Sequence, residues 1–531
     1  MNCAIKCASL GIHAELVSPF PSERAQSVMA AGGINAVTAG CDNGDSVECH
    51  IEDTLRGGAG IAGRNAVSGL CGNAEGIIRY LEGIGTVFTT DDKGRPAKRA
   101  FGGQSFRRTH YCGSATGKQI VSALIMEVRR YEAQGLITRR LRACFHSALI
   151  SDGICYGAIL FDEVHYELTA CYADALIIAT GGQNALFGKT TGSLSCDGYV
   201  AGKLLTQGVE LKNLEFIQYH PTTLETPQKK ILISEAVRGE GGRLFYEEDG
   251  KRVYFMEDKY GPKGNLMTRD VVSREMASLN KDFYLDISFA GKELIDERLS
   301  EVRDLCSKYG GIDITKEPVP VTCSIHFFMG GIAVHKDHQT NIKNLYAIGE
   351  CASIYHGANR LGGNSLLAAI YGGDVVSEAV AGKAREGEQK LFDKELEDAG
   401  DSLKRSLDNK SSFPVMYIRD MIASTMNEHL GIVRDAKSLE AGIRDLDYYL
   451  DISDKIRYDN SVLPYFNYSL TGIAALARAV MTSALFRQES RGAHFRSDHP
   501  EDDPDSAYAS IVSYDNGEYR IRYDKEDPYE D

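Results

Sequence analysis

Residues 356–366 read HGANRLGGNSL, in which Arg360 stands among two asparagines and three glycines. Glycine loses backbone entropy on ordering and has no side chain to pack, so this composition is foreign to an ordinary strand or helix. It is typical of a loop whose backbone another group must approach closely. The stretch therefore predicts a binding loop with one planar cation at its centre.

Two apolar segments that end in glycine predict buried strands. Residues 170–182 read ACYADALIIATGG, and residues 344–353 read NLYAIGECAS. Buried strands that stop at glycine are typical of a parallel sheet whose carboxyl edge meets a ligand. We therefore expect an α/β fold with a ligand at this edge.

The beginning of the sequence, MNCAIKCASLGIHAELVSPF, predicts most of a helix, a stop at Gly11 and a strand that carries Ala14, Leu16 and Val17. This is the pattern of the second half of a βαβ nucleotide-binding unit. The first strand and the glycine-rich turn of such a unit are missing, and we expect them to lie upstream of Met1.

Composition and charge limit the class of protein. The 531 residues are 43% hydrophobic and 25% charged, which is a globular balance. A chain of this length is expected to form about two to four domains. A formal charge of -15 argues against a nucleic-acid partner, because binding to phosphates needs a basic face. No uncharged apolar run is long enough for a transmembrane segment.

The cysteines predict a reducing compartment. There are 13 of them, with no C-x-x-C pair and no regular framework, which indicates reduced thiols in the cytoplasm. The N-terminus has no basic region followed by an apolar stretch and a small-residue cleavage site, so we expect no signal peptide. We expect no metal site in this chain.

Nine motifs occur in the order seen in one enzyme family. They read RAQSVMAAGGINA, FGGQSFRRTHY, ATGG, EFIQYHPTTL, ISEAVRGEGGRLF, LMTRDVVSREM, IHFFMGGI, LYAIGECAS and HGANRLGGNSL. From about residue 3 to 495 the sequence resembles the fumarate reductase and succinate dehydrogenase flavoprotein subunits, a family that includes L-aspartate oxidase. An ordered set of motifs is far more specific than any single glycine pattern.

The resemblance implies a Rossmann-like FAD-binding domain with an inserted α+β capping domain, followed by a helical C-terminal domain. Residues 221–325 are mixed in pattern, and residues from about 375 to 490 turn helical and charged, which agrees with this division. The expected parts are 1–220 (FAD-binding domain, first part), 221–325 (capping domain), 326–375 (FAD-binding domain, second part), 376–490 (helical domain) and 491–531 (C-terminal extension). The stretch ESRGAHFRSDHPEDDPD, residues 489–505, is expected to be solvated.

The resemblance implies that the ligand of the binding loop is FAD. In the family it leads into a helix whose N-terminus faces the pyrimidine end of FAD, where backbone amides and the helix dipole stabilise negative charge on reduced flavin. The resemblance implies that Ser365 and Leu366 supply those amides and that Glu350 contacts the ribityl chain. The other residues it places around FAD are Ser27, Ala31, Gly32, Gly33, Gly181 and Asp197. Taken singly, each glycine is equally consistent with an ordinary turn.

Arg360 suits the anchoring of a dicarboxylate, because a guanidinium binds a carboxylate bidentately and keeps its charge. The family uses the corresponding arginine in this way, and the resemblance adds His220, Thr222 and His326 as substrate contacts. We expect the remaining histidines of interest to be structural: His335, His338 and His494.

The resemblance assigns Arg269 as the proton donor in fumarate reduction. Hydride passes from flavin N5 to one alkene carbon, and a protein acid gives a proton to the other. Arginine is a very weak acid, with a pKa above about 12, so the residues alone would not suggest this role. It becomes tolerable if a strongly basic transition state takes the proton and a relay replaces it. Glu235 and Arg238, three residues apart, supply the implied relay; without the resemblance they predict a surface salt bridge.

Two positions depart from relatives within the family. Membrane-bound succinate dehydrogenases carry FAD covalently on a histidine of an R-S-H-T motif, where this chain has Gln26. We therefore expect noncovalent FAD, which favours reduction of fumarate. L-aspartate oxidases carry a glutamate where this chain has Phe101. An aromatic ring leaves a substrate ammonium unpaired, so we expect the site to prefer fumarate or succinate.

The leading hypothesis is therefore an FAD-dependent flavoprotein subunit of a fumarate reductase or succinate dehydrogenase. We expect an iron-sulfur partner subunit, because no cysteine cluster here could hold such a centre. We also expect a cytoplasmic location, or a peripheral one on the inner face of a membrane through partner subunits. The alternatives are an L-aspartate oxidase and, in another class, a nonenzymatic protein that lacks a complete FAD site because its glycine turn is absent.

Overall fold

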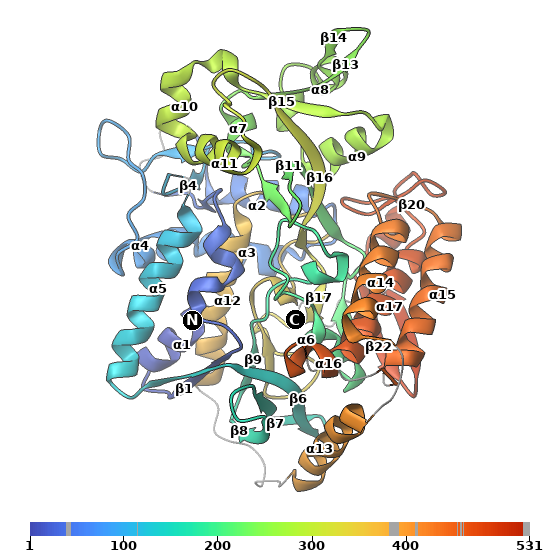
Figure 1. Ribbon diagram of the computed structural model, residues 1–531. Coiled ribbons are helices and arrows are strands. Elements are labelled where there is room, and N and C mark those ends of the chain that lie inside the picture. The colour runs from blue at the N-terminus through green and yellow to red at the C-terminus, as the bar shows by residue number, and fades with distance from the viewer. Residues whose placement is uncertain are drawn as a thin grey trace.

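The computed structural model describes residues 1–38, 44–113, 115–381, 392–408, 413–453, 455–456, 459 and 461–523. A central α/β region carries a cap at one end and a bundle of helices along one side (Figure 1). This arrangement confirms the predicted α/β fold with an inserted α+β cap and a helical C-terminal part.

The central region begins with the predicted helix and strand. Helix α1 (Asn2–Ser9) ends before Gly11, whose φ is +77°, and β1 (Ala14–Ser18) pairs in parallel with β5 (Ile137–Leu141). Up to the cap, its other elements are β2 (Ile34–Asn35), α2 (Val47–Gly57), α3 (Arg64–Gly72), α4 (Ala74–Gly83), β3 (Lys98–Arg99), β4 (Thr109–His110), α5 (Thr116–Ala133), β6 (Ala143–Ser151), β7 (Ile154–Asp162), β8 (Glu167–Tyr172), β9 (Leu176–Ile178), α6 (Tyr199–Thr206) and β10 (Leu211–Lys212).

The strand predicted over residues 170–182 is two strands. β8 pairs antiparallel with β7, whereas β9 pairs in parallel with β18 (Leu345–Ala347). The exposed residue Asp174 lies between them, outside either strand. The predicted parallel pairing of the two glycine-terminated segments is confirmed by β9 and β18.

The cap is built on a six-stranded sheet in the order β12-β11-β16-β15-β13-β14. Strands β11 (Ile217–Glu225) and β16 (Val319–Phe328) carry the chain into and out of it and pair antiparallel with each other. The other cap elements are β12 (Lys230–Leu232), α7 (Ala236–Gly239), β13 (Arg243–Glu248), β14 (Lys251–Val253), α8 (Phe255–Tyr260), α9 (Arg269–Leu279), β15 (Phe283–Asp286), α10 (Lys292–Arg298) and α11 (Ser300–Gly310). The cap has its own hydrophobic core, with Leu244, Val272 and Ile295 fully buried in it.

After the cap the chain returns to the central region and then forms the helices. The returning elements are β17 (Gly331–Ala333), β18, β19 (Ala352–Ser353) and α12 (Asn364–Ala381). The helical part contains α13 (Asp393–Asp408), α14 (Val415–His429), β20 (Val433–Arg434), α15 (Ala436–Ser453), α16 (Pro464–Tyr468) and α17 (Leu470–Phe486). A Cβ on Gly202 of α6 would lie 1.9 Å from the carbonyl oxygen of Gly472 on α17, so this close helix contact requires glycine.

The segment expected to be solvated, residues 489–505, is largely buried in its first half, where that prediction was wrong, and is exposed or half-buried from residue 497 on. Glu489, His494 and Arg496 are at most 1% exposed. Their charges are paired: Arg487 donates to Glu215 (2.6 Å) and to Glu489 (2.7 Å), and Arg496 donates to Asp498 (2.8 Å). Pairing of this kind makes burial of a charged segment tolerable.

The last elements complete a sheet of the central region. After β21 (Phe495–Arg496), strand β22 (Ser510–Asp515) pairs with both β10 and β23 (Glu518–Tyr523). The resulting order is β19-β17-β10-β22-β23. Residues far apart in sequence therefore share one sheet.

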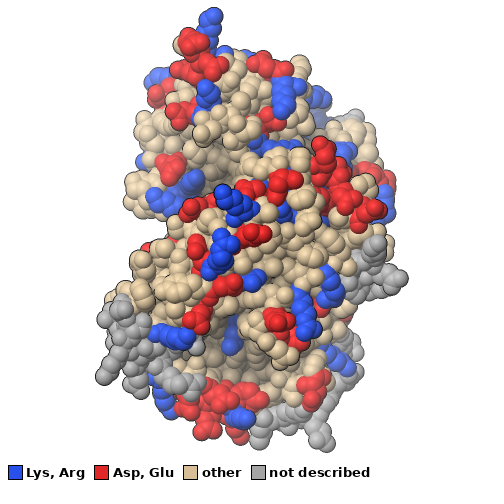
Figure 2. Space-filling view, turned by 90° about the vertical axis from the view of Figure 1, so that its right-hand side faces the viewer, with Lys and Arg blue, Asp and Glu red and all other residues tan. Residues whose placement is uncertain are grey.

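Charge on the face that carries the helices is mixed in sign (Figure 2). Acidic side chains gather at the end near α13, whose sequence contains Asp393, Glu395, Glu397, Asp398 and Asp401. Among the described residues, no helix combines the length and apolar character needed to cross a membrane.

Candidate functional site

The loop at 356–363 passes directly into α12, whose first residue is Asn364. Its side-chain amide is held on two sides, since Oδ1 lies 3.0 Å from His50 Nε2 and Nδ2 donates to Thr54 Oγ1 (3.0 Å). Gly363 has a φ of +87°, and a Cβ there would lie 2.1 Å from Asn35 Oδ1. The amides of a helix's first turn have no intrahelical acceptor. Those of Ser365 and Leu366 are therefore available to a ligand at this end.

The parallel strands β9 and β18 bring two glycine turns to one edge. Gly181, with a φ of +77°, follows β9, and the turn at Gly349 and Glu350 follows β18. A Cβ on Gly182 would lie 2.5 Å from Glu350 Oε1, which accepts a hydrogen bond from Phe328 N (3.1 Å). Loss of hydration raises the pKa of Glu350 to about 7. A carboxyl group of this kind can donate or accept toward a hydroxyl.

These features fit an FAD. Dinucleotides bind at the carboxyl edge of parallel strands, with a helix N-terminus directed at negative charge. Glu350 and the open turn of α12 supply a hydroxyl partner and an anion partner at that edge. When bound, FAD would supply hydride chemistry at this place.

The loop that contains Gln26 packs on the start of α5. A Cβ on Gly117 would lie 1.9 Å from the carbonyl oxygen of Ser27. Gly33 has a φ of +138°, and a Cβ there would lie 2.4 Å from the carbonyl oxygen of His110. Ser27, Ala31 and Gly32 are half-buried, so this loop keeps accessible surface beside the strand ends.

Asp197 is engaged by the helical part of the protein. Its Oδ2 accepts from Arg419 Nη2 (2.9 Å), and its Oδ1 accepts from Tyr465 Oη (2.8 Å). The backbone amide of Tyr199 adds a third bond to Oδ1 (3.1 Å). Asp197 thus ties α14 and α16 to the turn before α6, and its contact with FAD stays a prediction.

The predicted proton donor Arg269 and the predicted anchor Arg360, which come from separate motifs, meet at one side chain. Gln218 Oε1 accepts from Arg269 Nη1 (2.9 Å) and from Arg360 Nη2 (3.0 Å). Its Nε2 donates to Asn359 Oδ1 (2.7 Å) and to the carbonyl oxygen of Arg360 (2.8 Å). A guanidinium of the cap and one of the binding loop are therefore held together by one fully buried amide.

His220 and His326 lie next to this pair of arginines. Their rings are 5.1 Å apart between centroids, edge to face. Burial, together with repulsion from Arg269, lowers the pKa of both imidazoles well below the usual value, so both are neutral at pH 7. Thr222 lies behind His220, with its N 3.3 Å from Nδ1, and Thr191 Oγ1 lies 2.9 Å from His326 Nδ1.

Thr222 is directed away from the cluster. Its hydroxyl donates to the carbonyl oxygen of Ile233 (2.9 Å). Thr222 therefore contacts His220 from behind and helps to orient its ring. Contact between Thr222 and a substrate stays a prediction. When His220 Nδ1 accepts from the amide of Thr222, Nε2 carries the hydrogen, and this nitrogen is buried without a hydrogen-bond partner in the described part of the chain.

Glu235 is the carboxylate of the cluster. Its Oε2 accepts from Arg269 Nε (2.9 Å) and Nη2 (2.7 Å), and its Oε1 lies 3.3 Å from Arg238 Nη2. Burial would raise its pKa, but the charges of Arg269 and Arg238 outweigh burial and lower the pKa to about 2. Glu235 is therefore ionised at neutral pH, and the predicted surface pair of Glu235 and Arg238 is a buried one.

Phe101 closes the site between the loop at 26–33 and the binding loop. Its ring is 2.9 Å from where a Cβ on Gly32 would stand and 3.0 Å from one on Gly362. The next residue, Gly102, donates its amide hydrogen to Glu235 Oε1 (2.8 Å). An apolar ring thus lies immediately beside the charged cluster.

Positive charge in the cluster is incompletely compensated. Three buried guanidinium groups, those of Arg238, Arg269 and Arg360, face the ionised carboxylate of Glu235, and Glu350, with its pKa raised to about 7, adds at most one more negative charge beside Arg360. Burial and the nearby Arg269 lower the pKa of Arg360, and the carboxyl groups of Glu350 and Glu235 offset this only in part. Arg360 Nε and Arg238 Nε are also buried without a hydrogen-bond partner among the described residues.

Gln218, which joins the two arginines, was not among the predicted site residues. A signal was present, because Gln218 stands two positions before His220 on a strand and side chains two apart share one face. His338 and His494 are structural as predicted: His338 lies 2.7 Å from the Ala347 carbonyl oxygen, and His494 lies 2.7 Å from Arg434 Nη1.

Comparisons with known proteins place the chain in a family. A family model described as FAD binding domain matches residues 1–366, and one described as fumarate reductase flavoprotein C-term matches residues 419–529. The succinate dehydrogenase flavoprotein subunit of Bacillus subtilis is 35% identical, over 95% of this chain and 90% of that protein. The fumarate reductase flavoprotein subunit of Haemophilus influenzae is 31% identical, over 96% of this chain and 89% of that protein.

A solved structure extends the similarity to three dimensions. The E. coli quinol fumarate reductase FrdA aligns with a TM-score of 0.89 at 28% identity, over 98% of this chain and 94% of that one. The predicted FAD cofactor is confirmed by the matching FAD-binding domain. The chain therefore belongs to the fumarate reductase and succinate dehydrogenase family of flavoprotein subunits, which are FAD-dependent oxidoreductases.

Proposed function

We propose that this flavoprotein reduces fumarate, with Arg360, His220 and His326 holding the dicarboxylate and Arg269 delivering the proton. The observation that carries the proposal is the charge of the buried cluster. Three guanidinium groups and the carboxylate of Glu235 leave two positive charges uncompensated when Glu350 is protonated, and a dicarboxylate supplies the two negative charges that balance them.

The donors left open in the cluster match carboxylate oxygens. Arg360 Nε is a buried donor without a partner in the described chain, and His220 Nε2 is another in the tautomer in which Nδ1 accepts from the amide of Thr222. Leaving such donors unpaired costs free energy. A bound carboxylate would accept from both. Because the imidazoles of His220 and His326 are neutral, they position the substrate by hydrogen bonding, while Arg360 supplies the charge.

Arg269 has the geometry of a guided proton donor. Two of its nitrogens donate to Glu235 and a third donates to Gln218, so the guanidinium plane is fixed on two sides. Glu235 also contacts Arg238, and this gives a continuous path by which a proton lost from Arg269 is replaced. FAD, when bound, would supply the hydride, and the protein's part is to hold the acid, the anchor and the alkene in one geometry.

Two positions favour fumarate over other substrates. Gln26 cannot form a covalent link to flavin, and noncovalent flavin favours the reductive direction. Phe101 gives no acceptor for an ammonium group, which disfavours aspartate and hence the oxidase alternative.

Electrons must come from another subunit or donor in this proposal. The described residues contain no group of three or more His, Cys, Asp or Glu side chains that could hold a metal ion. We therefore assign the supply to an iron-sulfur partner, with the complex in the cytoplasm or on the inner face of a membrane through its other subunits.

The test is a comparison of substrates on one flavin-loaded preparation. The flavin is kept reduced by a low-potential dye, and reoxidation of the dye is followed after fumarate is added. With L-aspartate as the substrate, formation of peroxide is followed in a separate assay. Fumarate should reoxidise the dye with kcat/KM at least about a hundredfold above that for aspartate, as expected when a buried polar partner is missing for one of them. Equal values for the two compounds would move the assignment to an oxidase, and no turnover with either would support a nonenzymatic protein.

A further inference from the structure

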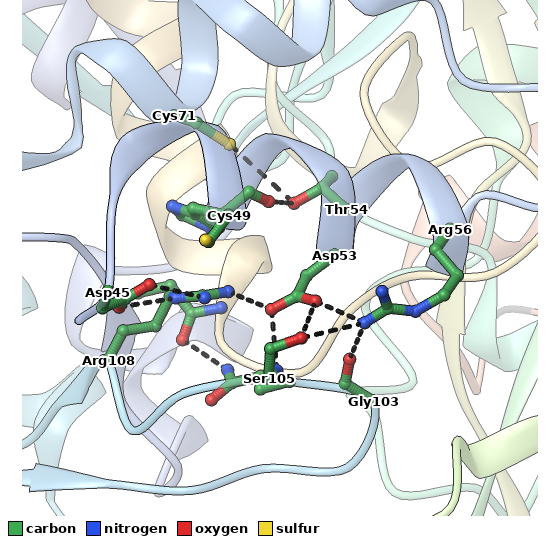
Figure 3. A network of polar contacts seen from close by, with 12 residues as sticks. Asp45, Cys49, Asp53, Thr54, Arg56, Cys71, Gly103, Ser105 and Arg108 are labelled. Atoms are coloured by element: carbon green, nitrogen blue, oxygen red, sulfur yellow. Dashed lines mark hydrogen bonds and ion pairs between the residues drawn. The ribbon is translucent and has the colours of Figure 1, made fainter. Parts of the chain in front are cut away.

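A second buried ionic cluster lies between α2 and the loop at 101–108 (Figure 3). Asp53 accepts from Ser105 N (2.8 Å), Ser105 Oγ (2.6 Å) and Arg108 Nη1 (2.6 Å), and it also pairs with Arg56. Asp45 holds the other side of Arg108, through Nη2 (2.8 Å) and Nε (3.1 Å). Asp53 is 1% exposed and Arg108 is fully buried.

These bonds hold a loop that has no regular structure of its own. Residues 101–108 form no helix or strand, so the loop depends on side-chain contacts for its position. Arg56, on the same helix, adds a bond to the carbonyl oxygen of Gly103 (3.2 Å). Figure 3 shows Asp53 and Arg56 reaching from one helix to the labelled Gly103 and Ser105 of this loop.

The opposite side of the loop rests against the proposed acid and its relay. Gly102 N donates to Glu235 Oε1 (2.8 Å), and Gly103 N donates to the carbonyl oxygen of Leu266 (3.3 Å), three residues before Arg269. A Cβ on Gly102 would lie 2.6 Å from Glu235 Oε1, and one on Gly103 would lie 2.9 Å from Thr268 Cγ2. The fit is so close that a shift of the loop must move Glu235 and the start of α9, or break both hydrogen bonds.

We propose that Asp53 is a positioning residue for proton delivery: through Ser105 and Arg108 it fixes the loop whose amides at Gly102 and Gly103 hold Glu235 and the segment leading to Arg269. The inference rests on the proposed function, in which Glu235 and Arg269 act in that step. It differs from a stabilising role, because removing one partner of any buried ion pair lowers stability. The positioning role predicts a fall in turnover per bound flavin, with little change in dicarboxylate binding.

The chain contains a matched control in the cap. Asp286 accepts from Ser288 N (2.9 Å), Ser288 Oγ (2.7 Å) and Arg252 Nη1 (2.7 Å), which are the same three kinds of bond that Asp53 makes with Ser105 and Arg108. Asp286 is 5% exposed and ends β15, at the edge of the cap core. Asp286→Asn therefore removes a buried carboxylate that holds a serine and an arginine, here the exposed Arg252, without touching the loop.

The experiment compares Asp53→Asn with Asp286→Asn in the full chain loaded with FAD. The measurements are kcat per bound flavin, KM for fumarate, and backbone hydrogen exchange of residues 101–105 and 264–269. Asp53→Asn should lower kcat about ten- to a hundredfold, as expected for a displacement near 1 Å of a reacting group. KM should change less than about threefold, because the anchors Arg360 and His220 are untouched. Exchange should accelerate in both segments, and Asp286→Asn should change none of these quantities.

A second pair of variants, with smaller changes, tests the proposal if Asp53→Asn does not fold. Ser105→Ala removes only the 2.6 Å hydroxyl bond to Asp53, and Ser288→Ala is its control. Ser105→Ala should reduce kcat per bound flavin severalfold and accelerate exchange at 101–105. If both loop variants match their controls in kcat per flavin and in exchange, Asp53 is only a stabilising residue. If the unaltered protein does not turn over fumarate, the proposed function fails, and hydrogen exchange alone then decides whether Asp53 holds the loop.

Discussion

Replacement of Arg269 by lysine separates proton delivery from substrate binding. Arg269 donates three hydrogen bonds, at 2.9 and 2.7 Å to Glu235 and at 2.9 Å to Gln218. A lysine keeps the charge but has no planar fork, so at least two of these bonds are lost. Bonds to charged groups contribute about 1.5–3 kcal/mol each. If that free energy holds the acid in the transition-state geometry, its loss of about 3–6 kcal/mol lowers kcat roughly 10²- to 10⁴-fold.

The matched change is Arg360→Lys, which falls on the other guanidinium held by Gln218. Arg360 makes one side-chain bond to that amide (3.0 Å), and its Nε has no partner in the described chain. Its loss should therefore raise KM for fumarate as well as lower kcat, because a bidentate carboxylate contact is removed. Both variants are assayed by dye-linked fumarate reduction per bound flavin. If Arg269→Lys keeps near-normal kcat while KM rises steeply, Arg269 is a second anchor and the proton comes from elsewhere.

The other predictions concern the cofactor, the substrate and acid stability. Acid precipitation should release the flavin into the supernatant, because Gln26 cannot bond to it; fluorescence retained on the denatured band would contradict this. Phe101→Leu keeps an apolar side chain and should preserve the preference for fumarate over aspartate, whereas Phe101→Glu should reduce it in competition kinetics. Burial lowers the pKa of His50 to about 4. In the unfolded chain the imidazole has a pKa of about 6.5, so between about pH 6.5 and 4 only the unfolded chain takes up this proton. The free energy of unfolding therefore decreases as the pH is lowered, by about 1.4 kcal/mol at pH 5.5 from His50 alone. Urea midpoints at pH 7.5 and 5.5 should show a smaller loss for His50→Gln.

Local patterns in the sequence predicted the elements that depend on local rules. The N-terminal helix, its stop at Gly11 and the strand after it follow from apolar spacing and glycine, and the structure has all three. The parallel pairing of β9 and β18 follows from two apolar runs that end alike. The division of residues 170–182 into two strands was not predicted, because a single Asp174 in an apolar run does not reveal that the two halves pair with different partners.

Pairing between distant residues could not be predicted in the same way. Motif order brought Arg269, Glu235 and Arg360 to one expected site, but the bridge by Gln218 depends on how the cap meets the binding loop. The charged segment at 489–505 was expected in water because charge usually favours exposure. Its first half is largely buried because Glu489 pairs with Arg487, which in turn pairs with Glu215, 272 positions away.

The pairing of β22 with β10 constrains how the protein can fold while it is being synthesised. Ser510 N donates to Asn213 Oδ1 across 297 positions of sequence, and β22 fills the place between β10 and β23. Until the ribosome has released β22, the β10 edge of that sheet has no neighbour, and an open strand edge is a template for pairing with other chains. The same sheet includes β19, which begins two residues after Glu350. We therefore expect the nascent polypeptide to rely on chaperones through this interval, and to retain flavin firmly only after the last strands have emerged.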